Sequence, residues 1–362
     1  MSRDDLFGNI RALFHSPPDE LHFEKLCALL EEASIEALEA VYLPYVLAHI
    51  SYWEENQRVM PWQWIEGIMR GERRYILLAP LAAVLNLSWR KLRQDQLERI
   101  LANMPLHHIT HLYLEDARLT PSSLERIVHH EGLRHVRVLG LAHNPLSKDG
   151  AAVLAQASSL RAIEELDVER CVLDDDALEI VLQGPCFGQL RRLDLSANLF
   201  DVKGMEVLAA APQRHTLEGL NLTSCLPSRG ARGARGGAMF GILTAAETAW
   251  PALRQLELGW WGFGPRDAAL FDTTMCGRLH LLDLQGSQLR VDGAQALSQC
   301  EALAQLQELD IRRNLIQDEG LLALVAPDSS LDELRRIHTG WNRISTALIE
   351  QLRARGDLLI LP

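Results

Sequence analysis

One short pattern recurs along most of this 362-residue chain and restricts the folds open to it. Its clearest copy is LRRLDLSANLF, residues 190–200, with apolar residues at Leu190, Leu193 and Leu195 and an asparagine at Asn198. The line returns as LQELDIRRNLI from Leu306, and most copies lie 27 residues apart. Other copies begin at Ile109, Val136, Ile163, Leu217, Leu253, Leu279 and Leu334, with a degenerate one from Ala82. A fixed period of this length predicts a solenoid, in which each repeat packs on its neighbours.

Each repeat has the same expected parts. A short strand carries two leucines, such as Leu193 and Leu195, and a turn and a returning helix follow, as in SKDGAAVLAQASSL, residues 147–160. Because alternate side chains of a strand face opposite ways, both leucines should enter the core and Asp194 should face away from it. The sequence therefore predicts an α/β fold with parallel strands on a concave face and helices on a convex face.

The first part of the chain lacks the repeat. Helical spacing occurs in residues 21–32, and further helices are expected in 34–54, interrupted at Pro44, and from Pro61. We interpret residues 1–80 as an all-α N-terminal cap that covers the core edge of the first repeat, which solenoids need for solubility. Residues 81–362 are then one repeat domain of about ten repeats.

The repeats also allow a family resemblance to be named. The signature N-x-L-x-x-x-G-x-x-x-L, carried by Asn144–Leu154 and Asn314–Leu324, resembles the ribonuclease-inhibitor subfamily of leucine-rich repeat proteins. The resemblance covers roughly residues 82–345. It implies a non-enzymatic protein-interaction module, or scaffold, whose concave face binds a protein. Since one fold hosts many roles, it does not identify that protein.

Two features depart from the repeat. The turn position holds Arg90, Ala117, Asn144, Cys171, Asn198, Cys225, Trp261, Ser287, Asn314 and Asn342. Asparagine suits it because its amide bonds an adjacent backbone, so Trp261 predicts a deviating backbone. The interval from Leu217 to Leu253 is 36 residues, nine above the usual 27, and the excess lies at SRGARGARGG, residues 228–237. A flexible basic excursion is expected there, either a tolerated surface insertion or a recognition loop.

The residue between the two core leucines should face the concave side. Down the repeats this position holds Asn86, Tyr113, Gly140, Asp167, Asp194, Asn221, Glu257, Asp283, Asp310 and His338, half of them carboxylates. Neighbouring strands lie about 4.8 Å apart, so adjacent carboxylates repel unless arginines such as Arg192 relieve them. The column is either an ordinary solvated strand face or a surface suited to a partner rich in Lys or Arg.

Tryptophans favour the second interpretation. Trp89, Trp260 and Trp341 share one position just after their strands, and tryptophan is enriched in binding hot spots. Of the pair Trp260 and Trp261, at least one should be accessible. The predicted partner-binding residues are Asp167, Asp194, Glu257, Trp260, Trp261, Asp283, Asp310, Arg312 and Trp341.

The composition of the chain indicates which kind of partner it binds and in which cellular compartment it lies. A net charge of -12 disfavours nucleic acid and favours a protein with a basic or mixed-charge surface. No run of about 18 apolar residues predicts a membrane span. The six cysteines lack C-x-x-C spacing, and the amino terminus, MSRDDLFGNIRALF, lacks a secretory signal. These features, with the worn repeats, indicate a bacterial cytoplasmic protein.

The sequence contains few motifs that indicate catalysis or the binding of a phosphate or a metal ion. The nucleophile motif G-x-S-x-G is absent, and GWWGFG at 259–264 lacks the Lys-Ser/Thr of a phosphate-binding loop. No carboxylate or cysteine is clearly placed to complete a set of metal ligands with His108 and His135. We therefore expect no catalytic residue, metal or cofactor. Two alternatives stay open. Ran GTPase-activating proteins resemble the chain in fold and length, but their long acidic tail is missing from RARGDLLILP. SPPDELHFEKLCALLEE, residues 16–32, resembles the P-x-E-L opening of an F-box, which would make the chain an adaptor.

Overall fold

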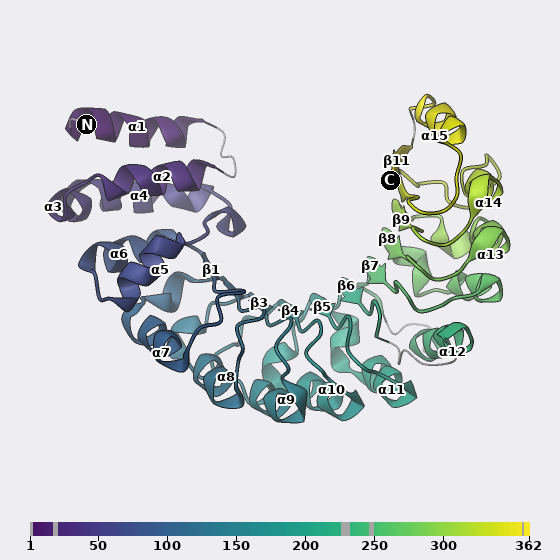
Figure 1. The fold of residues 1–362 in the computed structure, drawn as a ribbon, viewed down its shortest axis with the longest axis horizontal. Helices are drawn as coiled ribbons and strands as arrows, with labels where there is room; N and C mark the ends of the chain where they lie inside the picture. The colour runs from purple at the N-terminus through teal and green to yellow at the C-terminus, as the bar shows by residue number, and fades with distance from the viewer. Residues whose placement is uncertain (1–2, 17–20, 226–231, 246–249, 357) are drawn as a thin grey trace. The chain divides into compact units, whose positions relative to one another are not determined.

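The computed structural model describes residues 3–16, 21–225, 232–245, 250–356 and 358–362 (Figure 1). The chain divides into two compact units. Unit 1 comprises residues 1–141 and 156–163, and unit 2 comprises residues 142–155 and 164–362. No helix of the described residues is long and apolar enough to cross a membrane.

Unit 1 begins with helices. They are α1 (Arg3–His15), α2 (His22–Glu31), α3 (Ile35–Ala37), α4 (Leu43–His49), α5 (Trp62–Met69) and α6 (Arg73–Leu78). A π-helical turn, Leu38–Tyr42, joins α3 to α4, and the Leu43 amide donates to the Leu38 carbonyl five residues back. Pro44, which lacks an N–H, thus lies in the first turn of α4 and does not break the helical path. The helices predicted near residues 21–32 and after Pro61 are confirmed.

The first repeats complete unit 1. Its strands β1 (Val84–Asn86), β2 (His111–Tyr113) and β3 (Val138–Gly140) pair in parallel, with α7 (Gln94–Asn103) and α8 (Pro121–Val128) between them. At the outer edge of β1, the Met60 amide donates to the Val84 carbonyl at 3.0 Å, and the Val84 amide donates to the Arg58 carbonyl at 3.1 Å. The segment before α5 therefore covers the edge of the first strand.

Unit 2 repeats one strand and one helix. Its strands pair in parallel and in chain order: β4 (Glu165–Asp167), β5 (Arg192–Asp194), β6 (Gly219–Asn221), β7 (Gln255–Glu257), β8 (Leu281–Asp283), β9 (Glu308–Asp310), β10 (Arg336–His338) and β11 (Leu359–Leu361). Its helices are α9 (Ser147–Ala155), α10 (Asp175–Leu182), α11 (Val202–Ala210), α12 (Arg232–Thr244), α13 (Arg290–Leu297), α14 (Gln317–Leu324) and α15 (Thr346–Arg353). Within this unit the strands follow the inner side of the curve and the helices the outer side (Figure 1). The predicted α/β solenoid is confirmed.

Two details of unit 2 differ from the repeat pattern. The repeat after β7 returns through a 3₁₀ helix, Pro265–Phe271, and not through an α-helix. The strand β11 was not expected, because no asparagine turn follows LIL. On the outward side of β11, the Arg353 guanidinium donates to the Ile360 carbonyl at 2.8 Å. A side chain thus satisfies a backbone group that an edge strand would leave open.

The strand alternation agrees with the predicted register. Leu193 and Leu195 are buried, whereas Asp194 between them is only half-buried. The turn asparagines then tie each repeat to the one before it. The Asn198 amide donates to the Val168 carbonyl at 2.8 Å, and the Asn314 amide donates to the Leu284 carbonyl at 2.8 Å. The buried backbone of one repeat is therefore hydrogen-bonded by the next.

Trp261 fills the same role, contrary to expectation. Its indole Nε1–H donates to the Leu222 carbonyl at 2.7 Å, at the position that asparagine reaches in other repeats. The flanking φ angles, +64° at Trp260 and +73° at Gly262, match +58° at Arg313 and +57° at Leu315. The predicted backbone deviation is wrong, because the long indole supplies the missing donor. Trp261 is fully buried, so its assignment to partner binding is also wrong.

The glycine-rich stretch contains the start of a helix. Residues 228–231 lie outside the described residues, but α12 begins at Arg232, so the predicted flexible excursion is wrong for residues 232–237. At Gly236, a Cβ atom would lie 2.5 Å from the Trp261 carbonyl oxygen. Glycine is needed there for close packing of α12 on the turn after β7. The ring of Phe240 from α12 then packs 4.7 Å from that of Phe271.

Candidate functional site

The predicted binding residues lie mainly on what we call the strand face of unit 2. It consists of the first and third residues of β4–β10, whose side chains point away from the leucine core. The strands pair residue for residue, so Glu257 lies beside Asp283 and Asp283 beside Asp310. Asp167 and Asp194 are likewise neighbours, on β4 and β5. The predicted carboxylate column therefore exists, in two stretches separated by Asn221 on β6.

Most charges on the strand face have a partner. Arg192 pairs with Glu165, and Arg336 pairs with Glu308 at 2.5 Å, so among the described residues these arginines form salt bridges with the glutamates and not with the aspartate column. Asp194 accepts hydrogen bonds from the Asn221 amide at 2.8 Å and from the Ser196 hydroxyl at 2.6 Å. These side chains form an ordinary hydrogen-bonded strand surface.

Asp310 is neutralised more fully than expected. Its carboxylate is buried, and the Arg312 guanidinium donates to both of its oxygens, from Nε at 3.0 and 2.8 Å. Nη2 of Arg312 also lies 2.5 Å from Oδ2, so two nitrogens of the planar guanidinium engage the carboxylate. Asp310 and Arg312, both predicted to bind a partner, therefore bind each other.

Glu257 and Asp283 differ from the rest of the column. Both are half-buried, and neither forms a salt bridge with any residue that the structure describes. Asp283 accepts the Gln285 backbone N–H at 2.6 Å. Burial, followed by the charges of Asp283, Asp194 and Asp310, raises the pKa of Glu257 to about 7. Burial and Asp310 also raise the pKa of Asp283 to about 6, although the Gln285 N–H and the charges of Arg312 and His338 oppose the rise. The two carboxylates thus form an adjacent acidic pair that has no salt bridge among the described residues and holds its protons more tightly than ordinary carboxyl groups do.

Exposed tryptophans follow the strand face at one edge. Trp89, Trp260 and Trp341 take φ angles of +62°, +64° and +61°, so they share one turn position, as predicted. Their exposed fractions are 60%, 37% and 76%. Trp89 belongs to unit 1, whereas Trp260 and Trp341 belong to unit 2.

Arg313 joins the two tryptophans of unit 2. Its guanidinium carbon lies 5.9 Å from the Trp260 ring centroid and 5.1 Å from that of Trp341, both within cation–π range. The Trp260 ring also covers Gly286, where a Cβ atom would lie 2.7 Å from ring carbons. We call Trp260, Arg313 and Trp341 the tryptophan ridge. Sequence reasoning missed Arg313 as part of it, although Arg313 occupies the same turn position one repeat before Trp341.

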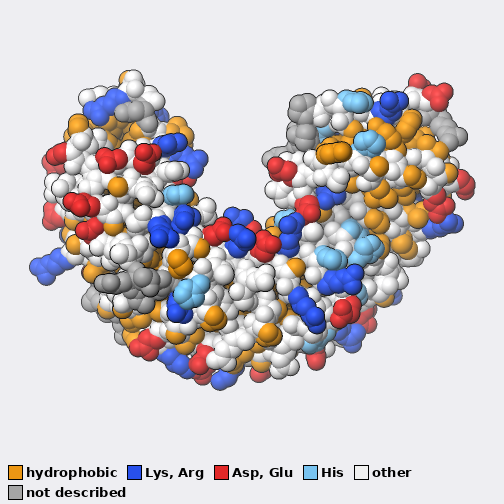
Figure 2. All heavy atoms as spheres, turned by 180° about the vertical axis from the view of Figure 1, so that it is seen from behind, with side chains coloured by type: hydrophobic (Ala, Val, Ile, Leu, Met, Phe, Trp, Pro, Cys, Tyr) orange, Lys and Arg blue, Asp and Glu red, His pale blue; other side chains and the backbone are white. Residues whose placement is uncertain are grey.

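No group of three or more His, Cys, Asp or Glu side chains that could hold a metal ion occurs among the described residues. All six cysteines are buried and free of disulfides. The P-x-E-L opening of the F-box resemblance begins at Pro18, and residues 17–20 lie outside the described residues. Figure 2 shows acidic and basic side chains intermixed over the face that it views, without a large patch of one sign.

Comparison with known proteins identifies the repeat and the fold. Residues 304–325 match a family model described as a leucine-rich repeat. No curated protein matches the sequence. The leucine-rich repeat-containing protein LegL7 from Legionella pneumophila is 18% identical over 75% of this chain and 89% of its own, with a TM-score of 0.52. A chain of the Rad7 and Elc1 complex of yeast is 15% identical over 91% of this chain and 86% of its own, with a TM-score of 0.51.

At these identities the two structures indicate the fold alone, which is the alternation of strand and helix found in unit 2. The periodic leucines, the turn asparagines that bond the preceding repeat and the matched family model agree with it. The chain is a leucine-rich repeat protein.

Proposed function

We propose that this chain is a non-enzymatic protein-interaction module that binds a basic segment of a partner protein on the strand face over β7–β10. Lys or Arg side chains of the partner would meet Glu257 and Asp283, and the tryptophan ridge would supply apolar contact beside them. The observation that carries the proposal is the Glu257–Asp283 pair. These neighbouring half-buried carboxylates form no salt bridge among the described residues, whereas Glu165, Glu308 and Asp310 do; Arg312 and His338 act on Asp283 only without direct pairing.

The energetics support a cationic partner. Two like charges side by side on a sheet oppose each other, and partial burial adds to the cost. A bound ammonium or guanidinium group would relieve both effects. Tryptophan offers a large rigid surface with little entropy to lose, so Trp260 and Trp341 suit the apolar part of such an interface.

The test begins with capture of a partner from native lysate by cross-linking and mass spectrometry. Affinity is then compared between the parent and the double variant Glu257→Gln, Asp283→Asn. We expect slower association and a weaker dependence on salt, because charge pairs steer encounter. The matched control is Asp292→Asn with Glu319→Gln, which removes the same charge from exposed positions on α13 and α14. Equal binding by both double variants would refute the strand-face proposal.

Trp260→Ala tests the apolar half of the site. If Trp260 is a hot spot, its truncation should lose about 2 kcal/mol or more of binding free energy. Leu199→Ala is the control, because Leu199 is an exposed apolar residue in another repeat of the same unit. An equal loss of binding free energy in both variants would show that the effect comes from nonspecific apolar contact and not from a hot spot at Trp260.

Further features fit this proposal. The buried free thiols suit a reducing compartment, so we place the protein in a cytoplasm, and its repeats suit the ribonuclease-inhibitor subfamily. The yeast structural neighbour was solved as a complex of two proteins, Rad7 and Elc1. Acceleration of GTP hydrolysis when the chain is added to small GTPases would overturn the non-enzymatic interpretation.

A further inference from the structure

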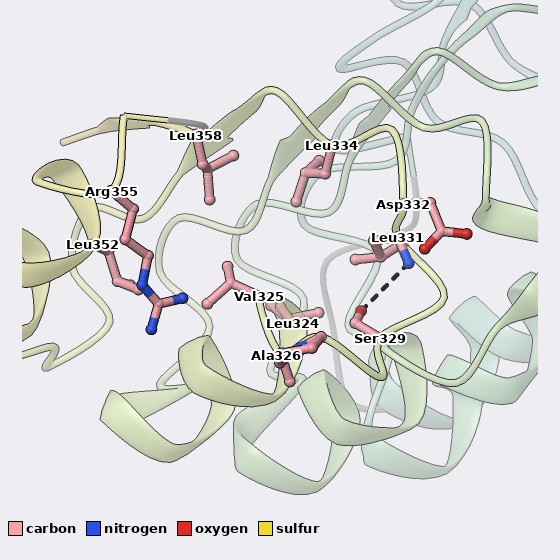
Figure 3. A pocket seen from close by; sticks show the side chains of 11 residues that line it. Leu324, Val325, Ala326, Ser329, Leu331, Asp332, Leu334, Leu352, Arg355 and Leu358 are labelled. Atoms are coloured by element: carbon pink, nitrogen blue, oxygen red, sulfur yellow. Dashed lines mark hydrogen bonds between the residues drawn. The ribbon is translucent and has the colours of Figure 1, made fainter.

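A pocket of about 410 Å³, lined by leucines together with polar and charged groups, lies at the end of unit 2 (Figure 3). Its floor includes Leu324 and Val325 at the end of α14, Leu331 and Leu334 of the following turn, and Leu352 of α15. Arg355 and Asp332 stand at opposite sides of its mouth (Figure 3). Neither makes an ion pair with another residue that the structure describes.

The pocket exists because the last repeat is short. Residues 325–335 join α14 to β10, and residues 298–307 join α13 to β9, whereas only residues 354–358 join α15 to β11. Earlier returning segments contain a turn that inserts a leucine or phenylalanine into the core, such as Leu303 and Phe187. The last segment is too short to form that turn, so the turn before it is left uncovered.

Earlier returning turns also satisfy the helix end of the preceding repeat. The Gln213 side chain donates to the Leu182 carbonyl at the end of α10 at 2.7 Å. The Ser330 amide donates to the Ser298 carbonyl after α13 at 2.7 Å. Among the described residues, nothing donates to the carbonyls of Leu324 and Val325 at the end of α14. A helix end needs such donors, so the pocket offers acceptors as well as apolar surface.

We propose that this pocket binds a short segment of a partner protein that replaces the missing turn. The segment would insert a leucine-like side chain and donate backbone N–H groups to the end of α14. It would carry an acidic residue toward Arg355 and a basic residue toward Asp332. The returning turns of the earlier repeats indicate that the segment needs an apolar side chain and free backbone N–H groups. The two charges at the mouth, which form no ion pair among the described residues, indicate the charged residues on either side.

The probe is a fluorescein-labelled synthetic peptide that copies residues 328–336, DSSLDELRR, the turn that covers the preceding repeat. Fluorescence anisotropy with the full chain should show saturable binding. A peptide with serine at both leucine positions should not bind. Ala326→Trp, which places a ring in the pocket from its lining, should abolish binding, and thermal melting will show whether that variant folds.

Arg355→Ala tests the charge without filling the pocket. We expect it to weaken peptide binding by about two- to fivefold, as for an exposed ion pair. Arg343→Ala removes the same charge from an exposed position outside the pocket and should have no effect. Glu257→Gln with Asp283→Asn should also leave peptide binding unchanged, so this site and the strand face succeed or fail independently.

Three results would overturn the proposal. One is the lack of saturable binding by the leucine peptide, and another is undiminished binding by a folded Ala326→Trp variant. The third is a dimer of the parent chain, seen by sedimentation velocity, that disappears in Ala326→Trp. That result would assign the pocket to a second copy of this chain and not to a partner segment.

Discussion

Trp261 shows how a single side chain can replace another of different chemistry. It donates to the Leu222 carbonyl at 2.7 Å and stacks on Phe263 with ring centroids 5.8 Å apart. Trp261→Phe keeps an aromatic ring but removes the N–H and part of the packing. We expect the free energy of unfolding in urea to fall by about 1–3 kcal/mol. Trp260→Phe, at the exposed neighbour, should change it by less than about 0.5 kcal/mol. Equal effects would show that the indole hydrogen bond contributes little.

Glu257 should make the folding stability of the protein depend on pH. Its pKa is about 7 in the folded protein, above the ordinary value of 4.5, so the folded state holds this proton more tightly than the unfolded chain. Its contribution therefore favours folding at low pH and is lost as pH rises from about 4.5 to about 7. Stability in urea should fall less between pH 5 and pH 8 in Glu257→Gln than in the parent. Parallel pH profiles for the two proteins would contradict the assigned shift.

At the scale of elements, α12 depends on its glycines. A Cβ at position 236 would lie 2.5 Å from the Trp261 carbonyl oxygen, whereas a Cβ at position 241 of the same helix would meet nothing within 4 Å. Gly236→Ala should therefore lower the melting temperature by forcing α12 away from the turn. Gly241→Ala should stabilise by about 0.5–1 kcal/mol through helix propensity alone. If both variants gained stability, α12 would not pack as described.

At the scale of the whole molecule, we propose that residues 1–80 act as a cap and residues 81–362 as the repeat domain. The Met60 amide and the Arg58 carbonyl bond the outer edge of β1, so deletion of residues 1–80 removes those partners. An uncovered strand edge beside an exposed core favours association between chains. Light scattering should show aggregates of the truncated chain. A monomer with the melting temperature of the full protein would instead mark this region as an independent domain.

Local patterns in the sequence predicted most of the architecture. The 27-residue period predicted the solenoid, and strand alternation placed Leu193 and Leu195 in the core and Asp194 outside it. The shared turn of Trp89, Trp260 and Trp341 followed from the same register. These predictions succeed because each repeat contacts its neighbours at fixed spacing. The position of a residue within the repeat therefore determines whether its side chain points into the core or away from it.

Contacts between repeats determine which of these side chains are paired or buried. Whether a carboxylate forms a salt bridge depends on where a long arginine side chain reaches, so Asp310 binds Arg312 while Glu257 and Asp283 form none among the described residues. The burial of Trp261 depends on the carbonyl that its indole meets one repeat earlier. The repeat period determines which way each side chain points. The distances between side chains and the pairing of their charges depend on residues that are far apart in the sequence. For that reason the repeat pattern was enough to predict the fold and the strand face, whereas the pairing and burial of each side chain on it depend on packing between repeats.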